Sequence, residues 1–155
     1  RSLSLVNSTN APRGKPAHLE GALQAPLADT DADGIPDEWE QDHFGGITNA
    51  SAGDDPDNDG YNNDEEFVAD TDPHDEFSCF GLTDITPLPD DQGKQVSFGQ
   101  SSANRFYNLY YQTNIQEDAW SILYTNVPGF TGSMSLDDVW TVGTSGFYRV
   151  SIQLP

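Results

Sequence analysis

Two stretches of the sequence place carboxylates at a spacing suited to a hard cation. Asp29 to Glu40 reads D-T-D-A-D-G-I-P-D-E-W-E, and Asp55 to Glu66 reads D-P-D-N-D-G-Y-N-N-D-E-E. Both match the pattern D-x-[DN]-x-[DN]-G-x5-E of a twelve-residue calcium loop at every constrained position. Calcium takes about six to eight oxygen ligands, so alternate side chains must turn inward while the backbone curls around the ion. Two complete matches 26 residues apart predict two Ca2+ sites.

Each position of the motif has a predicted role. Three acidic side chains open the loop, a glycine permits the turn, and the next residue offers its backbone carbonyl. The ninth residue binds directly or through water, and the final glutamate closes the site with both oxygens. The predicted ligands are Asp29, Asp31, Asp33, Ile35 (carbonyl), Asp37 and Glu40 in the first loop, and Asp55, Asp57, Asp59, Tyr61 (carbonyl), Asn63 and Glu66 in the second.

These loops lie in a strongly acidic segment. The chain has 155 residues and a net charge of −20, and residues 29–76 hold 18 of the 26 acidic residues without one Lys or Arg. Such a segment repels itself and would form a disordered linker unless cations neutralise it; the regular spacing argues against the linker. Nucleic acid and anionic lipid would repel the chain, and no apolar run is long enough to span a membrane. We therefore expect no nucleic-acid partner and no membrane insertion.

Each loop leads into a short predicted helix, over residues 36–44 and 63–69. Trp39, Phe44 and Phe67 are the apolar residues that would anchor these helices. No helical periodicity precedes either loop, so the units are loop–helix repeats rather than paired helix–loop–helix sensors. Metal binding would then supply much of the folding free energy of residues 29–76.

The repeats resemble a known family. D-x-D-x-D-G-I-P-D-E-W-E, a spacer, D-P-D-N-D-G-Y-N-N-D-E-E-F and A-D-T-D-P look like the thrombospondin type 3-like calcium repeats of secreted bacterial proteins. In that family the repeats act as structural spacers and often precede a β-sandwich that ends in an F-Y-R-V strand, as residues 147–150 do here. The resemblance implies an extracellular, secreted or cell-surface setting. Dockerins also carry two loop–helix repeats, but their loops usually end in Asp and lead into a longer helix.

The remaining residues, 77–155, predict an antiparallel β-sandwich, immunoglobulin-like in class. They hold 13 of the 17 aromatic residues, and turn residues separate short alternating runs. In the last run Tyr148, Val150 and Ile152 share one face. The predicted strands are 77–85, 94–98, 105–113, 120–125, 133–136 and 147–154. Six strands are fewer than the seven usual in such sandwiches, which would leave an exposed edge.

The N-terminal residues 1–28 form a tail of net charge +2 that could supply a further strand. Leu3 and Leu5 share one face of an extended segment over residues 1–10. Residues 11–28 are a linker able to return this strand to its own sandwich or carry it to a neighbour. Donation to a neighbour would join copies head to tail, into a filament unless the contacts close into a ring. The alternatives are pairing within the same subunit and a frayed terminus.

Functional expectations follow from these features. The sequence contains no recognisable catalytic motif, and its paired carboxylates are explained as calcium ligands. We therefore expect that the protein is not an enzyme. The sequence begins at Arg1 without an apolar leader, which indicates either a mature secreted product or a fragment of a longer protein. The leading hypothesis is a calcium-stabilised structural protein whose partners are copies of itself. The rival is a carbohydrate-binding module of a larger polysaccharide-degrading enzyme, with Phe106, Tyr110 and Phe147 as candidate glycan or interface aromatics.

Overall fold

Two short helices precede six strands in the computed structural model, which describes residues 27–114, 119–143 and 145–155. The helices are α1 (Asp37–Phe44) and α2 (Asn63–Ala69). The strands are β1 (Gly81–Pro87), β2 (Lys94–Ser101), β3 (Phe106–Gln112), β4 (Ser121–Pro128), β5 (Gly132–Asp138) and β6 (Phe147–Gln153). A 3-10 helix, Pro89–Asp91, joins β1 to β2. The tail residues Leu3 and Leu5 lie outside the described residues.

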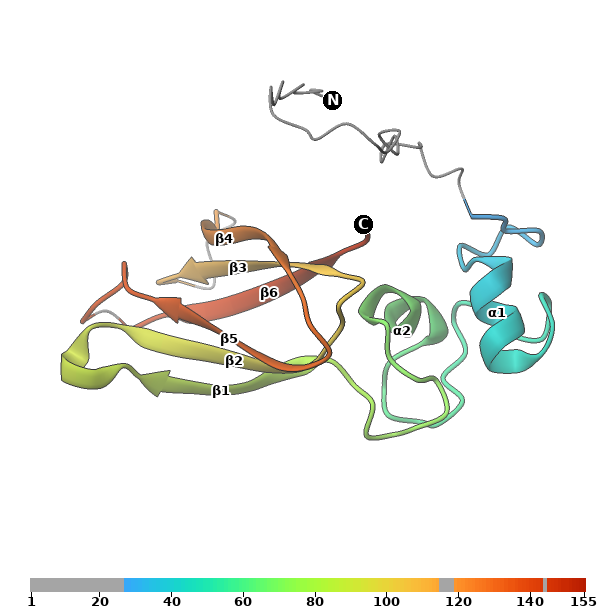
Figure 1. Ribbon diagram of the computed structural model, residues 1–155, viewed down its shortest axis with the longest axis horizontal. Helices are drawn as coiled ribbons and strands as arrows, with labels where there is room; N and C mark the ends of the chain where they lie inside the picture. The colour runs from blue at the N-terminus through green and yellow to red at the C-terminus, as the bar shows by residue number, and fades with distance from the viewer. Residues whose placement is uncertain (1–26, 115–118, 144) are drawn as a thin grey trace, which may run out of the picture.

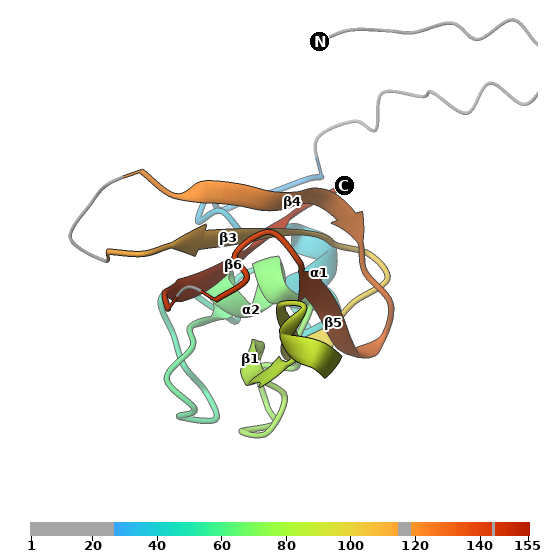
Figure 2. The ribbon, with the colours of Figure 1, turned by 90° about the vertical axis from the view of Figure 1, so that its left-hand side faces the viewer.

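The strands form two antiparallel sheets, as expected for a β-sandwich. One sheet has the order β1-β2-β5 and the other the order β4-β3-β6. The two sheets lie as separate layers, and both helices lie at one end of them (Figures 1 and 2). We call residues 29–76 the acidic lobe and residues 77–155 the sandwich, after the division predicted from the sequence.

The core of the sandwich lies between the two sheets. Phe98 of β2, Tyr107 of β3 and Met134 of β5 are buried together, with ring centroids of Phe98 and Tyr107 5.3 Å apart. Val150 and Ile152 of β6 pack against this cluster from the face predicted for them. Alternation places these β6 residues toward the core, whereas β3 also buries the polar residues Asn108 and Gln112.

One buried acid stabilises the end of the sandwich farther from the helices. Asp138 is fully buried and accepts hydrogen bonds from Thr141, from the Trp140 N–H and from the Tyr148 hydroxyl, the last at 2.6 Å. Burial alone would raise the pKa of Asp138, but these donors outweigh burial and hold it below its ordinary value. The same contact and burial raise the pKa of Tyr148 to about 12. Asp138 is therefore satisfied within the fold.

The acidic lobe holds itself together through aromatic rings. Trp39 of α1 contacts Phe44 and, at a centroid distance of 6.1 Å, Phe67 of α2. Phe44 contacts His74 edge-on at 4.8 Å, and the His74 ring nitrogen Nε2 lies 3.0 Å from the His43 carbonyl oxygen. The aromatic residues predicted to anchor the helices pack chiefly on one another.

Candidate metal centres

The two predicted loops have the same backbone conformation. The fourth residue is left-handed in both, with φ of 60° at Ala32 and 62° at Asn58. The sixth residue also has positive φ, 105° at Gly34 and 99° at Gly60, a region that glycine enters without steric cost. Two segments of different sequence thus form the same curled loop.

The loops also share their internal hydrogen bonds. In each, the sixth residue's N–H donates to the first aspartate, and the seventh residue's N–H donates to the third aspartate. The donor–acceptor distances are 3.2 Å for Gly34 and 2.9 Å for Ile35 in the first loop, against 3.1 Å for Gly60 and 2.8 Å for Tyr61 in the second. These bonds turn the carboxylates toward the loop interior.

Three carboxylates converge in each loop. Oxygen atoms of Asp29, Asp31 and Asp33 all lie within 4.8 Å of one another, and the same holds for the second triad, Asp55, Asp57 and Asp59. Three like charges at this separation repel strongly unless a cation lies among them. The predicted spacing therefore produces the predicted clustering.

The closing glutamate of the first loop is a buried carboxylate with no hydrogen-bond donor. Glu40 is fully buried, and no described residue donates to either of its carboxylate oxygens. Burial raises the pKa of Glu40, and the charges of Asp31 and Asp33 raise it further. A buried carboxylate in this state is costly unless a cation binds it.

The second loop shows the same feature at five positions. Its buried side-chain oxygens without a described hydrogen-bond donor are Asp55 Oδ1, Asp57 Oδ2, Asp59 Oδ2, Asn63 Oδ1 and Glu66 Oε2. These belong to positions 1, 3, 5, 9 and 12 of the motif, the positions whose side chains bind calcium in such loops. The set contains only oxygen atoms, as a hard cation requires.

Glu66, the last residue of the second loop motif, is also a buried carboxylate. It is 1% exposed, and burial raises its pKa to about 7, with the charges of Asp57 and Asp59 contributing. Thr71 opposes this rise by donating its hydroxyl hydrogen to Glu66 Oε1 at 3.2 Å. One oxygen is therefore held by Thr71, while Oε2 has no described donor.

The ninth positions of the two loops differ. Both carboxylate oxygens of Asp37 accept hydrogen bonds from Thr30, from its N–H and its hydroxyl, each at 2.6 Å. Asn63 donates its side-chain N–H to the Ser51 carbonyl at 2.8 Å and keeps Oδ1 buried without a described donor. Asn63 is thus placed for direct binding, whereas Asp37 favours the water-mediated form. Direct or water-mediated binding remains a prediction, as do the carbonyl ligands of Ile35 and Tyr61.

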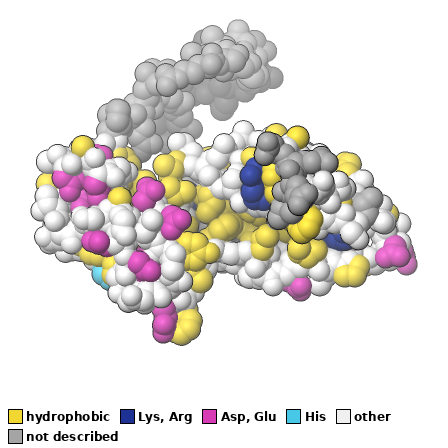
Figure 3. Space-filling model, turned by 180° about the vertical axis from the view of Figure 1, so that it is seen from behind, with side chains coloured by type: hydrophobic (Ala, Val, Ile, Leu, Met, Phe, Trp, Pro, Cys, Tyr) yellow, Lys and Arg dark blue, Asp and Glu magenta, His cyan; other side chains and the backbone are white. Residues whose placement is uncertain are grey.

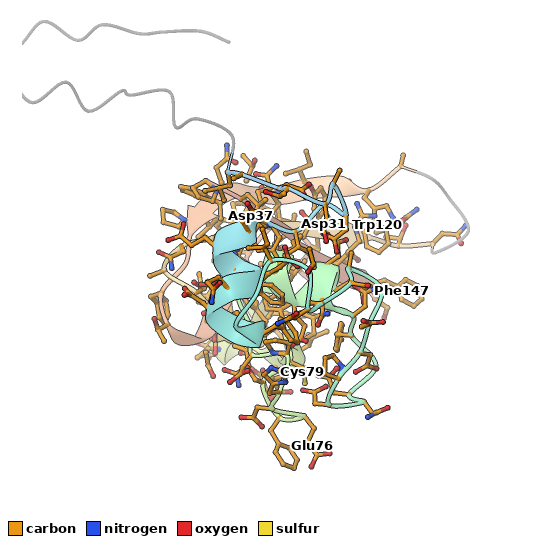
Figure 4. All side chains as sticks on the ribbon, turned by 90° about the vertical axis from the view of Figure 1, so that its right-hand side faces the viewer. Asp31, Asp37, Glu76, Cys79, Trp120 and Phe147 are labelled. Atoms are coloured by element: carbon orange, nitrogen blue, oxygen red, sulfur yellow. The ribbon has the colours of Figure 1, made fainter. Side chains whose placement is uncertain are left out.

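Figure 4 shows how the lobe presents its acids. Asp31 and Asp37 lie on the same side of the lobe, by the start of α1, whereas Glu76 projects from its far side. The start of α2 is fixed by a capping box, in which Asn62 and Glu65 each accept from the other's backbone N–H at 3.0 Å. Local capping and loop curvature together aim the ligands inward.

A contact between the loops was not anticipated from the sequence. The Ala52 N–H, in the segment before the second loop, donates to Asp33 Oδ2 of the first at 2.8 Å. Thr30 and Thr71 were missed as well, although Thr71 lies in the A-D-T-D-P stretch. Hydroxyl donors placed beside a loop motif are the signal that could have found these threonines.

The acidic lobe is joined to the sandwich by one buried arginine. Arg105 is 7% exposed and donates to the carbonyls of Phe67 and Val68, at 2.5 and 2.8 Å, at the end of α2. Its guanidinium also lies 3.4 Å from Asp70, which accepts from Ser102 as well. A cation at a helix C-terminus is favourable electrostatically. The sandwich thus holds the helix that carries Glu66.

The candidate aromatic residues lie on the outer face of the β4-β3-β6 sheet. Between β3 and β6, Tyr110 pairs with Arg149 and Gln112 pairs with Phe147. The side chains of these two pairs point to the face of the sheet opposite that of the core residue Tyr107. The Arg149 guanidinium carbon lies 4.6 Å from the Tyr110 ring centroid and 4.8 Å from that of Trp120. Phe106 is partly buried on this same face. Arg149 therefore already covers part of Tyr110, while Phe147 projects outward (Figure 4).

Replacing Ala32 with asparagine is expected to stabilise the first loop. An L-residue in left-handed conformation costs about 1–2 kcal/mol, whereas asparagine adopts it readily, as Asn58 does. We expect Ala32→Asn to raise the free energy of unfolding of the calcium-loaded protein by about 1 kcal/mol. Denaturant titration would measure this, with Asn58→Ala as the reverse control. Equal stability of all three proteins would contradict the assignment.

Comparison of the chain with protein-family models, with curated proteins and with solved structures finds no match. No helix of the described residues is long and apolar enough to cross a membrane.

Proposed function

We propose that this chain is a non-enzymatic, calcium-stabilised structural protein of an extracellular fibre or surface assembly. Two Ca2+ ions would bind in the two loops and convert the acidic lobe into a stiff connector. The observation that carries this proposal is the set of five buried, donorless oxygens in the second loop, at the ligand positions of the motif. The matching conformation of the first loop and the buried Glu40 support a second ion.

The joint between lobe and sandwich supports a mechanical role. Arg105 ties the end of α2 to the start of β3, so an ordered second loop would fix the direction of the lobe relative to the sandwich. The thrombospondin type 3-like resemblance is consistent with a spacer, and an immunoglobulin-like sandwich lacking a strand is consistent with assembly. An extracellular location fits because calcium there is abundant enough for sites of modest affinity.

Assembly would proceed by donation of residues 1–10 to a neighbouring copy. The test compares the full chain with a chain that lacks residues 1–10, both in millimolar calcium, by electron microscopy and analytical ultracentrifugation. We expect filaments or closed rings from the full chain and monomers from the shortened one. A full chain that stays monomeric with calcium would refute the assembly, as would unchanged filaments from the shortened chain.

The second candidate function is carbohydrate binding. It is favoured by the outer face of the β4-β3-β6 sheet, where Phe147 is 44% exposed beside the Tyr110–Arg149–Trp120 stack. Aromatic rings on a flat sheet can stack on sugar rings. Glycan-array binding by the full chain that is lost in Phe147→Ala or Tyr110→Ala would favour this function over assembly.

A further inference from the structure

The inner face of β1 is left half uncovered. Leu82 pairs with Phe98 across the β1–β2 ladder, and Ile85 pairs with Val96, so each pair points to the same face of the sheet. Phe98 and Val96 are fully buried, yet Leu82 and Ile85 are 43% and 45% exposed. Phe98 and Val96 are therefore shielded from solvent, whereas their β1 partners are not.

The edge strand of the other sheet shows the same pattern. Val150 and Ile152 of β6 pair with Leu109 and Tyr107, which are fully buried, but are themselves only partly buried. On the opposite side of the sandwich, where β4 leads directly into β5, Met134 is 4% exposed. Val127 of β4 and Leu136 of β5 are also only partly buried, so the two sides differ mainly in the exposure of Leu82 and Ile85 of β1. β1 and β6 each pair with one strand among the described residues.

A groove of about 300 Å³ lies between α2 and β6, and we call it the open-side groove; no residue of β1 lines it. Val150, Ile152 and Phe80 line it from the sandwich, and Asp64 and Val68 line it from α2. Figure 3 shows hydrophobic side chains between the acidic lobe and the sandwich on one face of the molecule. The groove has an apolar floor and an acidic rim.

The chain itself contains a segment that matches this groove. Residues 1–10 begin with Arg1, which is their only charged side chain, and an extended conformation would place Leu3 and Leu5 on one face. Ten extended residues reach about 33 Å, enough to run the length of the seven-residue β6 at about 3.3 Å per residue. Leu3 and Leu5 would contact the apolar side chains at the floor of the groove, and the positive charge of Arg1 is complementary to the acidic residues at its rim.

The proposed function assigns the segment to a neighbouring copy, because donation between copies is what would join them into an assembly. Pairing of the groove with the chain's own residues 1–10 is the alternative, and the crosslinking experiment below separates the two.

We propose that the open-side groove accepts residues 1–10 of a second copy as an added strand on the free edge of β6, and that calcium in the second loop is required for this. The inference rests on the proposed function, because it names the surface and the regulation of that assembly. Leu3 and Leu5 would cover Val150 and Ile152, the β6 residues that line the groove.

The calcium requirement follows from the construction of the groove wall. α2 has seven residues, too few for a stable isolated helix, so its position depends on the second loop and on Arg105. Glu66 closes that loop and also lines the groove. α1 lines no part of the groove, so loss of the first ion would act on it only indirectly, through contacts such as that of Trp39 with Phe67.

Crosslinking between two distinguishable full-length chains tests the proposal. Cys79 is the only cysteine and immediately precedes the groove residue Phe80. A donor chain carrying Ser4→Cys and Cys79→Ser is mixed with an acceptor chain of natural sequence and a different mass tag, and a short bis-maleimide is added. We expect a donor–acceptor crosslink in calcium that disappears in chelator. Acceptor Glu66→Gln should abolish it, and acceptor Glu76→Gln, at an exposed glutamate that lines no part of the groove, should retain it.

The outcomes separate this inference from the proposed function. Filaments without the crosslink would overturn the groove assignment and leave assembly standing, whereas the absence of any association would overturn both. A crosslink only within one Ser4→Cys chain that keeps Cys79 would show pairing in cis and overturn donation. A crosslink that survives chelation would overturn the calcium requirement.

A synthetic peptide of residues 1–10 should also shorten filaments of the natural chain, whereas a peptide with Leu3→Asp and Leu5→Asp should not.

Discussion

Chelation of calcium is expected to unfold the acidic lobe and to lower the melting temperature of the whole protein. Without cations, residues 29–76 bring together 18 acidic groups and bury Glu40 and Glu66 without enough donors. At free calcium 100 times above Kd, each site adds about 2.7 kcal/mol, so two equal sites add about 5 kcal/mol. For a domain of this size, that loss corresponds to a fall on the order of 20 °C. Circular dichroism melting with and without chelator would measure it.

The control is a matched pair of glutamate substitutions. Glu66→Gln should reduce the calcium stoichiometry in a calorimetric titration from two ions to one. Glu76→Gln changes the charge equally on an exposed side chain on the far side of the lobe and should keep both ions (Figure 4). An unchanged melting curve after chelation, or two ions bound by Glu66→Gln, would contradict the calcium assignment.

Local patterns predicted much of the fold because their physical causes are local. The second helix was predicted over residues 63–69 and is observed over Asn63–Ala69, since the loop motif sets its start and Asp70 and the Asp72–Pro73 step follow its end. The six strands occur where alternation placed them, with ends shifted by up to four residues. β1 begins at Gly81 rather than at residue 77, and β4 continues to Pro128. β1 and β4 also contain register shifts, which alternation alone does not predict.

The contacts that join distant segments could not be predicted in this way. Arg105 was included in a predicted strand, yet its side chain reaches carbonyls more than 35 residues earlier in the chain. The hydrogen bond from Ala52 to Asp33 depends on how one loop lies against the other. The sequence also did not show which strand leaves apolar residues exposed, because this depends on the order of strands within each sheet. The spacing of the acidic residues was enough to predict which side chains come together in each loop. The contact between the acidic lobe and the sandwich depends on the tertiary fold.

Arg105→Ala is expected to destabilise the calcium-loaded protein by about 3 kcal/mol, because removing one member of a buried charged contact leaves its partners unsatisfied. The carbonyls of Phe67 and Val68 would lose their donors, and Asp70 would lose its nearest cation. Chemical denaturation in saturating calcium would measure the loss. Arg105→Lys keeps the charge but not the guanidinium geometry, so it should recover only part of the stability.

The matched control for charge is Arg149→Ala, which removes an exposed arginine of the same sandwich and should cost well under half as much. The larger consequence concerns coupling between the two parts of the chain. In the natural protein, calcium should slow hydrogen exchange in β3 as well as in the acidic lobe, because Arg105 joins α2 to that strand. In Arg105→Ala, calcium should protect the lobe alone. Equal protection of β3 by calcium in both proteins would show that the sandwich gains its order independently of this joint, and the stiff-connector role would then lose its mechanical basis.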